Sequence, residues 1–266
     1  MNALPLLLTS CDENGILRLT LDDEPKRNAL SEQMLSSLQQ AFDDAARDKS
    51  VRVIILQATG KVFSAGHNLK EMTAARDHAD KGAAYFEKIL NACAKVMQTI
   101  VTCPKPVIAE VDGIATAAGC QLVASCDLAI ASDRAQFSTP GVHIGLFCST
   151  PMVALSRNLS HKHAMEMLLT GDMIGAARAK EMGLVNDVVS SDKLAMATQE
   201  MARKIASKSS HTVAIGKGAF YKQSEMTLSA AYDYASQVMV ANMLDYDAQE
   251  GISAFIEKRA AKWQDR

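Results

Sequence analysis

Residues Asp112 to Leu122 (DGIATAAGCQL) form the stretch that decides how this chain folds and what it can bind. Small residues lead from a loop at 112–116 into a pattern that predicts the beginning of a helix near Ala118. The first N–H groups of a helix have no partner within the helix, and the helix dipole places positive potential beside them. The stretch therefore predicts that backbone N–H groups bind an oxygen atom of a ligand at this helix start.

A second turn of small residues occurs earlier in the chain, at 63–70 (FSAGHNLK), and it also follows an apolar strand. Ligands of α/β proteins bind at the carboxyl ends of such strands. One N–H donor from each turn would form an oxyanion hole for a single carbonyl oxygen. Because residues three apart share a helix face, Gln121 is predicted on the same side as Ala118. Close helix–strand packing without a ligand also explains the small residues, and spacing alone leaves both interpretations open.

Length and composition are those of an ordinary globular protein. The chain has 266 residues, of which 48% are hydrophobic and 22% charged, and its formal net charge is −2. This favours one large domain, or a domain with an appendage. No long run of Lys or Arg indicates a nucleic-acid partner, and no apolar stretch is long enough to predict a membrane span.

Cysteine and histidine spacings predict neither disulfides nor a metal site. The six cysteines contain no Cys-x-x-Cys pair, so we expect free, mostly buried thiols in a reducing compartment. His161 and His163 are two residues apart, which does not place them on one helix face, and no carboxylate or cysteine cluster lies nearby. We therefore expect no metal ion.

Strands and helices alternate in the first part of the chain, and helices dominate the second. Apolar patterns predict strands at 17–21, 51–57, 107–111 and 128–131, and helices at 31–45, at 83–101 and from near 118. The later helices are predicted at 152–159, 164–169, 176–182, 193–207, 212–221 and 228–256, with an extended segment at 185–189. We predict a core of residues 1–190 and a C-terminal helical region, 191–266, that packs on the core and on neighbouring subunits.

Several short motifs occur in the order that is characteristic of one known family. They are FSAG at 63–66, PVIA at 106–109, AGCQL at 118–122, CD at 126–127, FSTP at 137–140, LTG at 169–171, AKEMGLV at 179–185 and EGISAFIEKR at 250–259. Together they resemble the crotonase (enoyl-CoA hydratase/isomerase) superfamily over roughly residues 15 to 262. The details at 117–127 and 145–151 resemble a narrower group within it, the enoyl-CoA hydratase domain-containing proteins.

The resemblance implies an α/β fold, a crotonase-like spiral of repeated ββα units with a C-terminal helical trimerisation region. It implies an acyl-CoA thioester as ligand and no cofactor beyond the coenzyme A that enters with it. It also implies self-association as a homotrimer or as a hexamer of two trimers. The oxyanion-hole donors map onto the N–H groups of His67 and Ala118.

The resemblance also assigns residues to the coenzyme A part of the ligand. The stretch that contacts coenzyme A maps onto His67, Asn68, Leu69 and Lys70. Lys26 or Arg27, in the early polar turn, and Lys258, near the end of the chain, match basic positions that meet the phosphates.

Two positions depart from the hydratases of this superfamily, which use a pair of glutamates to add water to the enoyl double bond. Gln121 and Gly141 stand where those glutamates would be, and neither residue can titrate. A positioned acid or base contributes about 10² to 10⁴ in rate. We therefore expect hydration by the family mechanism to be slow or absent, while an oxyanion hole alone would still stabilise a thioester enolate.

Three other side chains are candidates for catalysis, each against the alternative of simple packing. The imidazole of His67 lies next to the proposed hole, and His143 would share a side with Gly141 if that segment were extended. Cys148 would be a nucleophile only with an activated thiol. Three functions remain open: enolate chemistry with different side chains, acyl-CoA binding without turnover, and ordinary hydration by other groups.

The N-terminus lacks the charge and length of a secretory signal. We expect the cytoplasm, with the mitochondrial matrix as the alternative if this is a processed eukaryotic chain.

Overall fold

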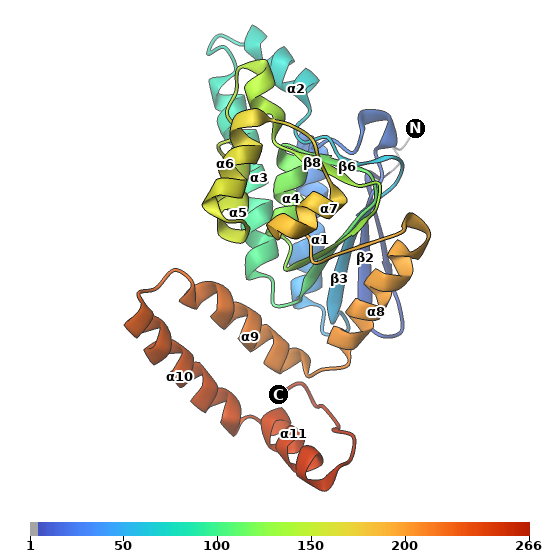
Figure 1. Cartoon of the computed structure of the whole chain (residues 1–266), viewed down its shortest axis with the longest axis vertical. Helices are drawn as coiled ribbons and strands as arrows, with labels where there is room; N and C mark the ends of the chain where they lie inside the picture. Colours follow the sequence, from blue (N-terminus) through green and yellow to red (C-terminus); the bar gives the residue numbers. More distant parts are fainter. Residues whose placement is uncertain (1–4) are drawn as a thin grey trace.

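The computed structural model describes residues 5–266, which form two β-sheets with helices around them (Figure 1). The larger sheet has the strand order β1-β2-β3-β5-β7-β10, in which β1 is antiparallel to β2 and the other neighbours are parallel. Its strands are β1 (Leu7–Cys11), β2 (Ile16–Leu21), β3 (Val53–Ala58), β5 (Val107–Val111), β7 (Leu128–Ser132) and β10 (Asp187–Val189).

The smaller sheet consists of short strands in the order β4-β6-β8-β9. They are β4 (Val62–Ser64), β6 (Ile114–Thr116), β8 (Gln136–Ser138) and β9 (Ile174–Gly175). Three times in succession the chain runs through a strand of the large sheet and then a strand of the small one, as β3–β4, β5–β6 and β7–β8. A helical segment follows each pair, so the predicted crotonase-like spiral of ββα units is confirmed.

The strands of the smaller sheet lie where the sequence predicted turns and loops. β4 and β6 are three residues long, which is too short for the alternation of apolar and polar residues to be recognised. β1 was also not predicted. The strands predicted at 51–57, 107–111 and 128–131 correspond to β3, β5 and β7 with small shifts at their ends.

The two faces of the larger sheet are covered by different helices. Along β3, Ile54 and Leu56 belong to the main core, which the sheet shares with helices α1 (Glu32–Arg47), α3 (Ala83–Thr102) and α4 (Ala118–Ser125). Val53 and Ile55 face the other way, where helix α8 (Leu194–Ala206) packs on a smaller apolar cluster. Successive side chains of a strand point to opposite faces, so one strand serves both clusters.

The remaining α-helices are α2 (Leu69–Ala74), α5 (Pro151–Asn158), α6 (His161–Thr170), α7 (Ala176–Met182), α9 (Ser210–Gln223), α10 (Leu228–Leu244) and α11 (Tyr246–Glu257). A 3-10 helix, η3 (Pro140–Ile144), follows β8. The predicted N-cap of α1 is confirmed, since Oγ of Ser31 accepts a hydrogen bond of 3.2 Å from the backbone N–H of Met34. In residues 5–266, no helix is long and apolar enough to cross a membrane.

The single helix predicted at 228–256 is wrong. α10 ends at Leu244, Asp245 is extended (φ −70°, ψ 151°), and α11 starts a new direction at Tyr246. The cause is the buried carboxylate of Asp247, which accepts hydrogen bonds from Ser209 and from backbone N–H groups near the end of the chain. These partners lie far from 228–256 in sequence, so the local pattern does not reveal the break.

Helices α9, α10 and α11 and the residues after them form an arm that extends away from the sheets (Figure 1); we call residues 210–266 the C-terminal arm. Lys217 of α9 joins it to the core. Its Nζ lies 2.7 Å from Oδ2 of Asp127 and donates to the carbonyl oxygens of Ile100 (2.9 Å) and Lys105 (3.0 Å). Large apolar side chains of the arm remain exposed, among them Phe220, Leu228, Leu244, Phe255 and Ile256.

Candidate functional site

The two turns of small residues lie against each other. A Cβ atom built on Gly66 would be 3.0 Å from the carbonyl oxygen of Thr116 and 3.1 Å from the backbone nitrogen of Ala118. A Cβ atom on Gly119 would be 2.3 Å from the carbonyl oxygen of Ser64. Both glycines are thus required by close packing, and that packing places the 63–67 turn beside the first residue of α4.

The peptide before α4 has an unusual conformation. Ala117 has φ 51° and ψ −120°, a region that residues other than glycine rarely adopt. Its N–H donates to the carbonyl oxygen of Ser138 (2.9 Å), and the hydroxyl of Thr116 donates to the carbonyl oxygen of Ala65 (3.2 Å). These bonds to β8 and to the other turn hold the strained residue in place.

The two proposed donors are not occupied by another described part of the chain. In the part of the chain that the structure describes, neither the N–H of His67 nor that of Ala118 donates a hydrogen bond to a protein acceptor. The neighbouring groups are occupied, since the N–H of Leu30 donates to the carbonyl oxygen of Gly66 (2.8 Å). An N–H group without a protein acceptor at a helix start is suited to an anionic or polarised oxygen.

The early basic turn lies beside this site. The carbonyl oxygen of Arg27 accepts from the N–H of Ala65 (3.1 Å), and that of Asn28 accepts from the hydroxyl of Ser64 (2.8 Å). The side chains of Lys26 and Arg27 are exposed, with Nζ of Lys26 3.7 Å from a carboxylate oxygen of Asp23. The structure therefore brings the backbone of the early basic turn next to the 63–67 turn, and the side chains of Lys26 and Arg27 project from it into solvent.

Residues 67–70 lead from the turn into α2. Oδ1 of Asn68 caps this helix by accepting from the N–H groups of Lys70 (3.1 Å) and Glu71 (3.5 Å). Leu69 and Lys70 are exposed on its first turn. Lys258 is elsewhere, because it ends α11, which lies at the opposite end of the molecule from α2 (Figure 1). A single chain does not bring Lys258 to the other basic residues.

Gln121 is buried on α4, with 4% of its surface exposed. Its side-chain Oε1 is buried and has no hydrogen-bond partner among the described residues. A buried acceptor without a donor is uncommon and costs about 1–3 kcal/mol. The position predicted to face the ligand therefore holds a polar atom that the protein itself does not satisfy.

Gly141 is buried in η3 and has no room for a side chain. A Cβ atom there would be 2.9 Å from the carbonyl oxygen of Leu146 and 2.9 Å from Sγ of Cys148. The first of these obstacles is backbone, which cannot rotate away as a side chain can. Any larger residue at this position would have to displace the 146–148 segment.

His143 does not lie in an extended segment, because residues 140–144 form the 3-10 helix η3. Its ring is exposed, and Nε2 lies 2.8 Å from the carbonyl oxygen of Thr170 at the end of α6. A carbonyl can only accept, so Nε2 carries the proton in this contact. The contact ties η3 to α6, together with the hydroxyl of Thr139, which donates to the carbonyl oxygen of Met167 (2.9 Å).

Of the other two candidates, Cys148 is buried and His67 is half-buried. Burial raises the pKa of the Cys148 thiol, which disfavours the nucleophilic thiolate. Burial lowers the pKa of His67, and the nearby Leu30 backbone opposes that shift only in part. Both ring nitrogens of His67 are buried without a hydrogen-bond partner among residues 5–266, so a neutral imidazole stands beside the proposed hole with its hydrogen-bonding capacity unused.

Sequence reasoning missed the residues that orient Ala117. Ser138 and Thr116 do so through a carbonyl and a hydroxyl, and the FSTP motif contained Ser138 without revealing this role. It also missed an open cleft of about 710 Å³ between α1, α2 and α3, lined by Glu32, Glu71 and Tyr85 among others, which lies apart from Ala118. No group of three His, Cys, Asp or Glu residues with metal-binding geometry occurs in residues 5–266.

Known proteins resemble this chain along nearly its whole length. Residues 12–266 match the family described as enoyl-CoA hydratase/isomerase. The enoyl-CoA hydratase domain-containing protein 3, mitochondrial, of Xenopus laevis is 51% identical over 94% of this chain and 84% of the relative. The human protein of that name is 49% identical over 94% of this chain and 81% of its own length.

Solved structures agree with these relatives. An enoyl-CoA hydratase of Mycobacterium smegmatis is 50% identical and superposes with a TM-score of 0.93, over 98% of this chain and 99% of the other. The human enoyl Coenzyme A hydratase domain-containing protein 3 is 47% identical with a TM-score of 0.92, over 97% and 100%. The chain therefore belongs to the enoyl-CoA hydratase/isomerase family, the crotonase superfamily, and within it to the group of enoyl-CoA hydratase domain-containing protein 3.

Proposed function

We propose that this protein binds an acyl-CoA thioester, with the thioester oxygen between the N–H groups of His67 and Ala118. The observation that carries the proposal is the contact between the two turns, with Gly66 against the backbone nitrogen of Ala118 and both N–H groups free. Two preorganised donors at one oxygen stabilise the enolate more than the ground-state carbonyl, and the loss of one such donor costs about 10²–10³ in rate. Coenzyme A enters with the substrate, and the proposal needs no further cofactor.

We further propose that hydration is slow and that the enolate serves another reaction, such as isomerisation, thioester hydrolysis or decarboxylation. Gln121 supplies an amide in place of an acid or base, and the packing around Gly141 leaves no space for a carboxylate. The neutral imidazole of His67 is the titratable group closest in sequence to the hole, and we assign it the role of moving the α-proton.

The coenzyme A end of the ligand would meet Lys26, Arg27 and the segment Asn68–Lys70 of one subunit. Lys258 can join them only from the arm of a neighbouring subunit, because its own arm holds it far from α2. The exposed apolar residues of the arm fit burial between subunits. We therefore propose that the protein assembles as a homotrimer, or as two such trimers.

The names of the animal relatives place those proteins in mitochondria. This supports the mitochondrial alternative for this chain, and the expectation of a cytoplasmic protein has no support among them.

Gly66→Ala tests the binding site directly. Gly66 has φ 84°, and the added Cβ would lie 3.1 Å from the nitrogen of Ala118, so the change strains the turn and obstructs the hole. We expect butyryl-CoA affinity, measured by isothermal titration calorimetry, to fall at least about tenfold, a difference of 1.4 kcal/mol. Gly175→Ala is the matched control, because a Cβ atom there meets nothing within 4 Å. Equal affinity in both variants would contradict the proposed hole.

A second candidate function is acyl-CoA binding without turnover. It is favoured by the engagement of His143 with Thr170 and by the raised pKa of Cys148, which leave few groups free for catalysis. Exchange of the α-protons of butyryl-CoA in D₂O, followed by NMR, separates the two. Exchange that is lost in His67→Gln supports enolate formation, whereas binding without any exchange supports the second candidate.

Ordinary hydration is the third possibility, and crotonyl-CoA is its test. We expect a rate at least about 10² below that of a two-glutamate hydratase measured alongside. A comparable rate would contradict the proposal that Gln121 and Gly141 deprive the site of its acid and base.

A further inference from the structure

The chain doubles back after α11. Lys258 ends the helix in a left-handed conformation (φ 53°), and the guanidinium of Arg259 then binds both carboxylate oxygens of Glu250, at 2.7 and 2.9 Å. The backbone N–H of Lys262 donates to the same carboxylate at 2.7 Å. The segment after α11 is thereby folded onto the helix that it follows.

The last four residues, Trp263–Arg266, then cross from α11 to the core; we call them the C-terminal strap. The indole N–H of Trp263 donates to the carbonyl oxygen of Ser207, just past α8 (2.9 Å). The N–H groups of Gln264 and Asp265 donate to the carboxylate of Asp247 at 2.7 and 2.8 Å. Asp247 is only 1% exposed and also accepts from the hydroxyl of Ser209 at 2.5 Å.

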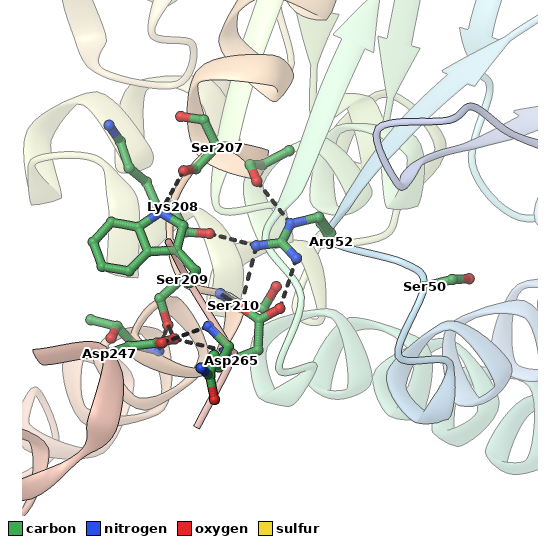
Figure 2. A network of polar contacts seen from close by, with 12 residues as sticks. Ser50, Arg52, Ser207, Lys208, Ser209, Ser210, Asp247 and Asp265 are labelled. Atoms are coloured by element: carbon green, nitrogen blue, oxygen red, sulfur yellow. Dashed lines mark hydrogen bonds and ion pairs between the residues drawn. The ribbon is translucent and has the colours of Figure 1, made fainter. Parts of the chain in front are cut away.

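Arg52, which immediately precedes β3, connects this strap to the large sheet (Figure 2). Its guanidinium donates to the carbonyl oxygens of Ala206 (2.8 Å) and Lys208 (2.7 Å) and lies 2.8 Å from Oδ2 of Asp265. The other oxygen of Asp265 accepts from the N–H of Ser210 at 2.7 Å. The guanidinium group of Arg52 thus connects the core to the turn between α8 and α9 and to the strap.

We infer that Arg52 and Asp265 are positioning residues, which hold α11 at a fixed place relative to the core through the C-terminal strap. Two sets of contacts attach the C-terminal arm to the core, and each holds a different helix. Lys217 fixes the middle of α9 through Asp127, and the strap fixes α11. Without the strap, α9 stays on the core while α11 and Lys258 become free to move. That the strap also positions Lys258 for acyl-CoA rests on the proposed function. That the strap holds α11 on the core, which we call its mechanical role, does not.

Hydrogen–deuterium exchange tests the mechanical role on the intact chain. In Asp265→Ala we expect amides of α11 to exchange about tenfold faster, because the sub-global opening of this helix becomes easier. Arg52→Lys should also accelerate exchange in α11, since one ammonium group cannot make all the hydrogen bonds of the guanidinium. In Asp265→Asn we expect an exchange rate between those of the unaltered protein and Asp265→Ala. Arg47→Ala is the control, because it removes an exposed ion pair with Asp44 on α1. Unchanged exchange in α11 would overturn the inference.

Two further measurements distinguish a local effect on α11 from a general loss of folding. Unchanged exchange in α4 shows that the fold is intact. Trp263→Phe provides a milder change, which removes the hydrogen bond to Ser207 and makes the ring beside Gly251 smaller but leaves Arg52 and Asp265 in place. If Asp265→Ala failed to fold, faster exchange of α11 in Trp263→Phe would support the inference, and unchanged exchange would overturn it.

The role toward the ligand is tested with butyryl-CoA. We expect Lys258→Ala and Asp265→Ala to weaken binding by a similar factor, and the double variant to bind no more weakly than either one. Additive losses would overturn the positioning of Lys258, even if exchange showed that the strap holds α11. If the unaltered protein bound no acyl-CoA, the proposed function would fail, while the exchange result would stand.

Discussion

Glycines at the contact between the two turns are the residues on which both fold and site depend most directly. Gly119→Ala would place a Cβ atom 2.3 Å from the carbonyl oxygen of Ser64 and must push α4 away from β4. We expect the free energy of unfolding to fall by about 1–3 kcal/mol, as for other overpacked cores. Urea unfolding measures this change, with Gly175→Ala as the control, and no loss relative to that control would contradict the close approach of Gly119 to Ser64.

Gln121 offers the opposite kind of test. Replacing its unpartnered oxygen by an apolar group of similar shape, as in Gln121→Met, removes the cost of a buried acceptor without a donor. We expect the ligand-free protein to become more stable by about 1 kcal/mol. If thermal unfolding showed a clear loss instead, Oε1 would have a partner in solution, such as a bound water.

His67 makes stability depend on pH in a definite direction. Its folded pKa is lowered by burial from an ordinary value of 6.5, so the unfolded chain takes up the proton first as the pH falls. The contribution of the neutral ring is complete above pH 6.5 and decreases below it, by at most about 1.4 kcal/mol per pH unit. Between pH 7 and pH 5 we expect the free energy of unfolding to fall less in His67→Gln than in the unaltered protein, as measured by urea unfolding. An equal fall in both proteins would contradict a lowered pKa of His67 in the folded state.

At the scale of elements, the sequence was most informative where an apolar pattern was long. It predicted α1 with its Ser31 cap, α3, α7 and β5 with ends that match the structure closely. The sequence pattern did not predict the short strands β4 and β6 or the break at Asp245. Two three-residue strands pair with each other from different ββα units. The chain bends at Asp245, next to Asp247, whose buried carboxylate binds residues 209, 264 and 265.

The attachment of α9 to the core is also decided between elements. Lys217 is buried against Asp127 and two carbonyl groups, so Lys217→Met leaves the carboxylate without its cation. Breaking such a buried pair costs about 3–5 kcal/mol, and we expect a loss near the lower limit because Tyr221 and the N–H of Val107 still donate to Asp127. Lys204→Met, on the last turn of α8, is the control in a chemical unfolding experiment.

At the scale of the whole molecule, the proposed assembly depends on the exposed apolar side chains of the C-terminal arm. Phe255 is 85% exposed on α11, and Phe255→Glu places a charge where a subunit contact would bury it. We expect light scattering after size-exclusion chromatography to show a trimer for the unaltered protein and smaller species for this variant. Leu8→Glu, on the edge strand β1, should leave the mass unchanged. A monomeric unaltered protein would contradict the proposed trimer.

The sequence by itself determined the order of the main strands and helices, the family, and the two turns of small residues, because each of these is encoded in a continuous pattern or motif. Only the tertiary structure decided that a side chain on Gly66 would meet the nitrogen of Ala118, that Gly141 has no space for a side chain, and that His143 binds the end of α6. These contacts join residues from about 5 to more than 50 positions apart. Close packing specifies them through shape and hydrogen bonding, and no local pattern records which segments will meet.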